Sequence, residues 1–216
     1  MNVDPLYRLR VRTPRLELRL PDDDALEQLH EIAAAGIHPP GEMPFGVAWT
    51  DDLDHDMFVG YHHHLRDSWR PEAWKIDLGV WAEGELVGVQ GIGADDFAVK
   101  RTVATGSWLG ARSQRRGIGT EMRTAVVELA FRHLRAEAVT SSAFDANLAS
   151  RRVSEKLGYR VIGRETLSPR GTPQPHVLLR LDRGDWRRAP FPVEIEGAEA
   201  CLSLFGAVSA TSSAPP

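Results

Sequence analysis

The segment QRRGIG, at residues 114–119, brings two arginines and two glycines together. Glycine lets the backbone approach a ligand without a Cβ atom in the way, and arginine donates charge-assisted hydrogen bonds to phosphate oxygens. If the segment opens a helix, its first-turn N–H groups lack intrahelical partners and lie at the positive end of the helix dipole. These residue types predict a site for a pyrophosphate group. An ordinary strand-to-helix turn with solvated arginines is the alternative interpretation.

The neighbouring segments place this turn between a strand and a helix. Residues 105–110 (TGSWLG) have strand character, and residues 117–134 are amphipathic. The apolar residues of the second segment follow the spacing of one helical face: Ile118, Met122, Ala125, Val126, Leu129 and Leu134. We therefore expect the glycines at the N-terminus of a long helix.

A second segment, NLASRRVSEKLGY at residues 147–159, follows an apolar run at residues 138–144 that is typical of a buried strand. Ala149, Val153 and Leu157 repeat every four residues, which predicts a short helix. Asn147 is a good N-cap residue and Gly158 a good C-terminal stop. The chain thus has two strand-to-helix units in succession.

Together, QxxGxG and NxxSxxxxEKLGY resemble the motifs of the GCN5-related N-acetyltransferase (GNAT) superfamily. The residues of both motifs are most similar to those of the branch that includes the Rim-type ribosomal-protein acetyltransferases. The order of elements agrees over residues 13–181. The resemblance implies an α/β fold with a central mixed, mostly antiparallel sheet that is flanked by helices and splayed at the coenzyme A site. It also implies direct transfer of an acyl group from acyl-coenzyme A to an amine.

The resemblance further implies which residues bind the coenzyme. Trp108 and Leu109 would bond the pantetheine arm through their main chain, and the Leu109 N–H would stabilise the developing oxyanion. Asn147 would bond the arm through its amide, and Arg151 would add positive charge. The pyrophosphate would lie on the turn and the helix start, which comprise Gln114, Arg115, Arg116, Gly117, Ile118, Gly119 and Thr120.

The leaving thiolate needs a proton, and many GNAT enzymes supply it from a tyrosine seven residues after the asparagine of this helix. Ser154 occupies that position here, which is a departure from the family pattern. Ser150 is then the expected proton donor, because the Rim-type pattern also has serine there and a helix N-terminus stabilises a thiolate. A second capping hydroxyl is the structural alternative for Ser150.

The acceptor amine must be neutral to attack. A lysine side chain loses about 4–5 kcal/mol at pH 7 unless a base assists, whereas an α-amino group loses only about 1 kcal/mol. Glu42 is the first candidate base, followed by Asp77 and Asp145, although each is also explained as a solvated or capping carboxylate. The sequence therefore favours an α-amine or another amine of low pKa as acceptor, in a protein N-terminus or a small molecule.

The default donor by resemblance is acetyl-coenzyme A, while relatives that share the EMPFxxxWT loop are associated with succinyl-coenzyme A. A succinyl donor would require a cation near the end of its acyl chain, for which the sequence offers Arg66, Arg70, Lys75 and Arg101. Because Ser154 replaces the tyrosine, a catalytically silent coenzyme-binding regulatory or interaction protein is the alternative function.

Composition limits the other possibilities. A net charge of −4 with 42% hydrophobic residues is ordinary for a globular protein and gives no reason to expect nucleic acid or a membrane surface as partner. The single cysteine, Cys201, excludes an intrachain disulfide, and with no signal-peptide pattern it favours the cytoplasm. His62, His63 and His64 point about 100° apart on a helix, so we expect no metal site.

The rest of the chain predicts the arrangement of the domain. We expect a strand at residues 13–20, a helix to residue 35, a second helix at residues 53–69, and a hairpin that turns at Glu83-Gly84. The loop at residues 36–52 carries Met43, Phe45 and Trp49, so it should fold over something. We place the acyltransferase domain at residues 1–182, a C-terminal appendage packing on the core or on a partner subunit of a possible homodimer at 183–210, and a disordered tail at 211–216.

Overall fold

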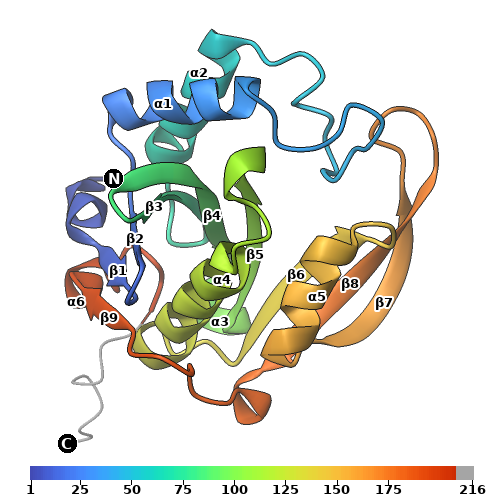
Figure 1. Ribbon diagram of the computed structural model, residues 1–216. Helices are drawn as coiled ribbons and strands as arrows, with labels where there is room; N and C mark the ends of the chain where they lie inside the picture. The colour runs from blue at the N-terminus through green and yellow to red at the C-terminus, as the bar shows by residue number, and fades with distance from the viewer. Residues whose placement is uncertain (208–216) are drawn as a thin grey trace, which may run out of the picture.

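The computed structural model describes residues 1–207 and contains one nine-stranded sheet with the order β7-β8-β6-β5-β4-β3-β2-β1-β9 (Figure 1). Only β5 and β6 are parallel; every other neighbouring pair is antiparallel. The strands are β1 Arg10–Arg12, β2 Leu16–Arg19, β3 Ala73–Ala82, β4 Glu85–Asp95, β5 Thr102–Leu109, β6 Ala138–Phe144, β7 Arg160–Leu167, β8 Gln174–Asp182 and β9 Glu194–Glu196. The predicted α/β class with a mixed, mostly antiparallel sheet is confirmed.

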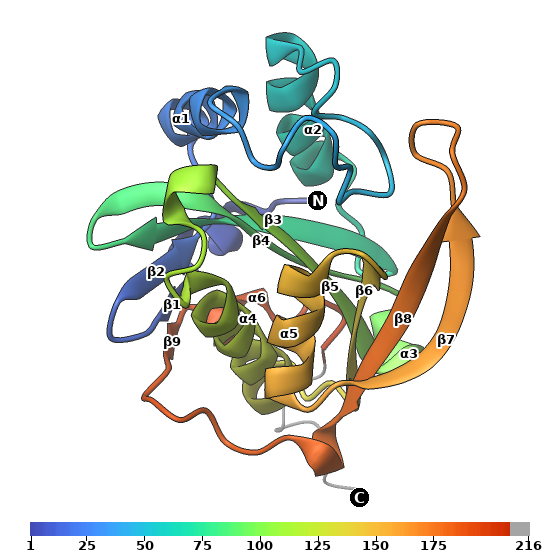
Figure 2. The same ribbon diagram turned by 45° about the vertical axis from the view of Figure 1, so that its right-hand side comes forward.

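Helices cover both faces of the sheet (Figure 2). One face carries α1 and α2, whose Leu26, Leu29 and Phe58 pack on Val89 of β4. The larger core lies against the opposite face, where α4 is buried. The helices are α1 Asp23–Ala34, α2 His55–Asp67, α3 Phe97–Lys100, α4 Ile118–Glu128, α5 Leu148–Leu157 and α6 Ala198–Cys201, and a π-helical turn, Leu129–His133, extends α4. No helix among these described residues is long and apolar enough to span a bilayer.

Local signals account for several element boundaries. Asp22 and Asp54 cap α1 and α2 by accepting bonds from the N–H groups of Ala25 and Met57. Glu83 and Gly84 both have positive φ, which confirms the predicted tight hairpin between β3 and β4. The strand predicted at residues 13–20 is wrong at its start. Residues 13–15 instead form the turn between β1 and β2, where the N–H of Thr13 donates to the Leu16 carbonyl.

Helix α4 is more deeply buried than its amphipathic pattern predicts. Every residue from Glu121 to Glu128 is buried, the charged ones included. The carboxylate of Glu128 accepts bonds from the Trp186 indole and the Ala189 N–H, each at 3.0 Å. The chain after β8 therefore covers the polar side of α4. The spacing of the apolar residues of this helix does not reveal that contact.

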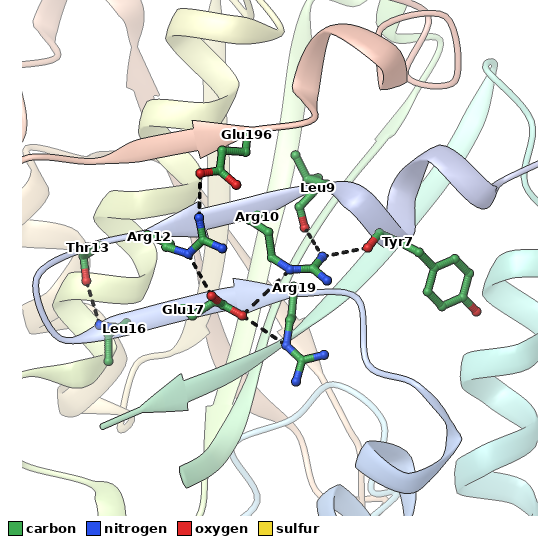
Figure 3. Close-up of polar contacts among 9 residues, drawn as sticks. All are labelled: Tyr7, Leu9, Arg10, Arg12, Thr13, Leu16, Glu17, Arg19 and Glu196. Atoms are coloured by element: carbon green, nitrogen blue, oxygen red, sulfur yellow. Dashed lines mark hydrogen bonds and ion pairs between the residues drawn. The ribbon is translucent and has the colours of Figure 1, made fainter. Parts of the chain in front are cut away.

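The C-terminal segment continues the sheet and fills its core. Strand β9 pairs with β1, and Figure 3 shows Arg12 between two carboxylates, 2.8 Å from Glu17 and 2.7 Å from Glu196. The indole N–H groups of Trp69 and Trp74 donate to the carbonyls of Leu204 and Phe205, at 2.9 and 3.1 Å. Residues 194–207 thus pack on their own chain. The predicted disordered tail at 211–216, with residues 208–210 of the appendage, lies outside the described residues.

Candidate active site

The phosphate turn, residues 114–119, has the backbone conformation of an anion-binding loop. Arg115 and Gly117 have φ of 60° and 83°, and Gly117 is the N-cap residue of α4. A left-handed conformation is costly for arginine and easy for glycine. Within residues 1–207, the N–H groups of residues 115–119 have no hydrogen-bond acceptor. Five consecutive free donors at a helix N-terminus are groups that suit phosphate oxygens.

Two predicted members of this site already have partners. The N–H of Thr120 donates to the Gly117 carbonyl at 3.1 Å, so the row of free donors ends at Gly119. The side-chain amide of Gln114 donates to the carbonyls of Ile37 and Leu109, at 2.6 and 2.8 Å. Gln114 therefore ties the phosphate turn to β5 and to the chain after α1.

An ion pair with one buried partner fixes the other side of the phosphate turn. Glu121, in the first turn of α4, has a side chain only 8% exposed. Its carboxylate accepts bonds from Thr13 Oγ1 at 2.6 Å and from Arg15 Nε at 2.8 Å. Arg15 Nη1 also donates to the Arg116 carbonyl at 3.3 Å. The β1–β2 turn thereby holds the phosphate turn in place, a role the sequence did not predict for Glu121 or Arg15.

The sheet is splayed between β5 and β6. These two strands pair only from Thr102/Ala138 to Ala104/Thr140, although β5 continues to Leu109 and β6 to Phe144. Beyond these pairs Gly106 and Ser142 are exposed, so the gap opens on the face that carries α1 and α2. Trp108 and Leu109 lie on the β5 side of this gap, and Trp108 is half-buried against Trp49 at a ring separation of 6.0 Å.

Arg123 of α4 joins the two strands where they diverge. It donates to Ser141 of β6 at 3.0 Å and to Ser107 of β5 at 3.3 Å, and it is only 3% exposed. Among residues 1–207 no carboxylate pairs with it, and burial lowers the pKa of its guanidinium. Since both partners are strand residues remote in sequence, an arginine in an amphipathic helix gave no signal of this contact.

Helix α5 begins beside the end of β6. Asn147 is its N-cap and accepts a bond from the Ser150 N–H at 3.1 Å, as its sequence predicts. The Ser150 hydroxyl has no partner among the described residues, so it does not serve as a second cap. Arg151 pairs with Asp145 at 2.9 Å, and Ser154 is fully buried. Ser150 is therefore the free hydroxyl on the first turn of α5.

The loop between α1 and α2, residues 35–54, reaches across to the β7–β8 hairpin, and we call it the roof loop (Figures 1 and 2). Arg170 in the hairpin binds both carboxylate oxygens of Asp51, at 2.6 and 2.5 Å, and lowers the pKa of that carboxyl group. The rings of Phe45 and Trp49 pack at a tilt with their centroids 5.1 Å apart, and Met43 is buried. The predicted folding of this loop over other residues is confirmed: it bridges the two sides of the splayed sheet.

The three carboxylates predicted as bases differ in their surroundings. Glu42 lies in the roof loop and is exposed. Asp77 is buried in β3 and lies 3.4 Å from both the Lys75 ammonium and the Tyr61 hydroxyl. Asp145 pairs with Arg151 and Arg164, at 2.9 and 3.1 Å. Two of the three are therefore already neutralised by a cation.

The three adjacent histidines of α2 face different environments. His62 is 5% exposed and packs edge-on against Phe58 at 5.0 Å, His63 lies 3.0 Å from Asp23, and His64 is exposed. Burial lowers the pKa of His62 to about 4. This histidine is therefore neutral at pH 7.

The depressed pKa of His62 predicts a loss of stability in mild acid. The unfolded chain takes up the proton near pH 6.5, whereas the folded chain resists until about pH 4. The contribution of neutral His62 to the free energy of unfolding is thus fully present above pH 6.5, and about 3 kcal/mol of it is lost as the pH drops to 4. Urea unfolding at pH 7 and 4.5 should show a smaller decline for His62→Gln than for the unaltered chain. An equal decline would contradict the assignment, and His64→Gln is the matched control.

Comparison with known proteins identifies the family. A model described as "Acetyltransferase (GNAT) domain" matches residues 15–160. Among solved structures, the ribosomal L7/L12 α-N-protein acetyltransferase RimL in complex with coenzyme A is 16% identical, with 79% of this chain and 95% of that chain covered and a TM-score of 0.65. RimJ of Mycobacterium smegmatis, in complex with a coenzyme A disulfide, is 17% identical, with 92% and 95% covered and a TM-score of 0.66.

The match covers most of the chain, and the mixed, mostly antiparallel sheet flanked by helices agrees with it. The chain belongs to the GNAT acetyltransferase family. A third neighbour, a putative ribosomal-protein-serine acetyltransferase from Vibrio cholerae, is 22% identical, with 80% and 97% covered and a TM-score of 0.62. At these identities the neighbours show a shared fold.

Proposed function

We propose that the protein is an acyl-coenzyme A-dependent N-acyltransferase that acts on a primary amine of a protein N-terminus or a small molecule. The observation that carries this proposal is the row of free N–H groups at residues 115–119, next to the open gap between β5 and β6. Anions bind at helix N-termini, and the pyrophosphate of coenzyme A is such an anion. Arg115 and Arg116 are exposed beside these donors and add positive charge.

The gap would receive the pantetheine arm. Its β5 side offers the main chain of Trp108 and Leu109, and its far end meets the first turn of α5, with Asn147 and Ser150. A backbone N–H that polarises the thioester carbonyl typically contributes a few kcal/mol to catalysis, and Leu109 is the proposed donor. Gln114 and Thr120 would act by shaping the phosphate turn, and Arg151 by positioning Asp145.

Acetyl is the proposed default donor, and succinyl is the second. The acceptor proposed first is an α-amino group, because it needs little help to lose a proton at pH 7. The name of RimL, a ribosomal L7/L12 α-N-protein acetyltransferase, is consistent with a peptide amine. A reducing compartment such as the cytoplasm is also proposed, since the single thiol, Cys201, is buried and burial raises its pKa to about 11.

Ser150→Ala tests the chemical part of this proposal. The free hydroxyl at the first turn of α5 is proposed to protonate the leaving thiolate, so its removal should lower kcat roughly 100-fold. The KM for acetyl-coenzyme A should change little, because the hydroxyl is not needed to hold the pyrophosphate. Release of free thiol, followed with a short peptide that has a free N-terminus, measures both constants.

The exposed Ser203 provides the matched control, since Ser203→Ala removes the same atom from a residue outside the site. An unchanged kcat for Ser150→Ala would remove the serine from the mechanism. If the unaltered chain binds coenzyme A but shows no turnover, the alternative function is favoured. That alternative is a catalytically silent coenzyme-binding protein, which the serine at position 154 suggested.

A further inference from the structure

His176 of β8, the strand next to β6, pairs with a glutamate whose own side chain is partly exposed. Its Nδ1 lies 3.0 Å from Oε1 of Glu165, the residue directly opposite on β7. The His176 side chain is 10% exposed. Its other nitrogen, Nε2, has no hydrogen-bond partner among residues 1–207, yet it is not sealed from solvent. A carboxylate that accepts from Nδ1–H leaves the lone pair on Nε2, which is the basic form of the ring.

The strand register places this histidine across the gap from the proposed thioester site. Ala104 and Thr140 are the last paired residues of the parallel strands β5 and β6, so counting on along both strands sets Trp108 level with Phe144. Phe144 in turn pairs with His176, and their rings lie 4.9 Å apart. Because alternate strand residues share a face, Trp108, Phe144 and His176 all lie on the face that carries α1 and α2.

The roof loop covers this face from one side of the gap to the other. Trp49 contacts Trp108 on the β5 side, at 6.0 Å. Gly46 approaches Leu167 of β7, where an added Cβ would lie 3.6 Å from the leucine methyl group, and Leu167 shares its face with Glu165 two residues earlier. The roof loop therefore contacts both β5 and β7 on the face where Trp108, Phe144 and His176 lie.

We propose that His176, held by Glu165, is the base that deprotonates the acceptor amine. This inference rests on the proposed function. His176 Nε2 takes one proton from the ammonium group, and the neutral nitrogen then forms the C–N bond as the C–S bond breaks. The second amine proton goes to the sulfur through Ser150, and His176 releases its proton to solvent. The products are the amide, the free thiol and one proton.

The carboxylates of the site serve this step less well. Asp77 and Asp145 already pair with cations, and Glu42 is exposed. The imidazole is neutral when it accepts from the ammonium, and its carboxylate partner stabilises the cation that forms. His176 is thus the group on this face whose free lone pair and position both suit a base.

Acceptors of graded basicity test the proposal. At pH 7 ethylamine is almost entirely protonated, whereas 2,2,2-trifluoroethylamine is already neutral. With saturating acetyl-coenzyme A, His176→Asn should lower kcat/KM for ethylamine about 100-fold and leave that for trifluoroethylamine within about threefold. Glu165→Gln, at an exposed strand position, should lower kcat/KM for ethylamine about tenfold. This variant tests the same pair if His176→Asn does not fold.

His64→Asn is the matched control, because it changes an exposed histidine of α2 and should match the unaltered chain. The melting-temperature rise with acetyl-coenzyme A should be kept in every variant, which shows that the coenzyme site is intact. Equal losses for both amines, or no loss for either, would overturn the role of His176. If the unaltered chain acylates neither these amines nor a peptide, the proposed function is wrong, and the role of His176 that depends on it is wrong as well.

Discussion

Gly117→Asp is expected to raise the KM for acyl-coenzyme A at least about tenfold, which corresponds to about 1.4 kcal/mol of binding free energy. Gly117 is the N-cap of α4, has a φ of 83° and is exposed between the free N–H groups of the phosphate turn. An aspartate there places a negative charge and a side chain where the pyrophosphate is proposed to lie. Initial rates at varied acetyl-coenzyme A, or calorimetric titration, measure the effect.

Gly117→Ala separates the charge from the backbone strain. Its Cβ would lie 3.4 Å from Arg15 Nη2, and it adopts the same unfavourable positive φ without the carboxylate. We expect this control to lose some stability but much less coenzyme affinity than the aspartate variant. Equal affinity in all three proteins would show that the phosphate turn does not hold the coenzyme.

Phe205→Ala is expected to lower the free energy of unfolding by about 3–5 kcal/mol, a large share of the total stability of an ordinary domain. Phe205 is fully buried and packs edge-on against Trp74 at 4.7 Å and Trp69 at 5.7 Å. The substitution leaves a cavity between two indoles whose N–H groups also bond to this segment. Urea unfolding at pH 7 measures the change.

The matched control is Phe191→Ala, which removes the same ring from a half-exposed position in the same C-terminal stretch. It should cost far less than Phe205→Ala. A similar small cost for both would mean that residues 198–207 are not part of the core. A chain cut before Val193 would then fold normally, whereas we expect it to unfold because it loses β9 and this whole cluster.

Local signals in the sequence were enough to predict most strands and helices of the domain. Asn147 and Gly158 cap α5 as their types predict, because a cap depends on residues within one turn of the helix. The glycines at 117 and 84 mark positions with positive φ for the same local reason. The strand predicted at residues 13–20 starts three residues too early, because its alternating leucines do not show that residues 13–15 turn the chain.

Contacts between distant residues were beyond such signals. Glu121 meets Arg15 106 residues away, and Arg170 meets Asp51 119 residues away. Each of these residues is ordinary in its own segment, and only the folded sheet brings the partners together. The same holds for Arg123, whose partners lie on two different strands, and for His176, which the sequence shows only as one member of an alternating strand.

The prediction that the roof loop folds over other residues was correct but incomplete. Its aromatic residues indicated a loop that covers something, and the structure shows Trp49 against Trp108. The sequence did not reveal that the roof loop also contacts the β7–β8 hairpin, where Arg170 binds Asp51. Glu42, predicted as a base because it belongs to this loop, is exposed, whereas His176 is buried against Phe144 at a ring separation of 4.9 Å.

Melting temperatures of the purified protein with free, acetyl-, succinyl- and malonyl-coenzyme A test whether the protein binds the coenzyme. A ligand at a hundred times its dissociation constant stabilises the folded state by about 2.7 kcal/mol, which gives an easily measured rise. We expect a rise with free and acetyl-coenzyme A that is strongly reduced in Gly117→Asp. No rise with any of the four compounds would contradict the coenzyme site and the acyltransferase function built on it.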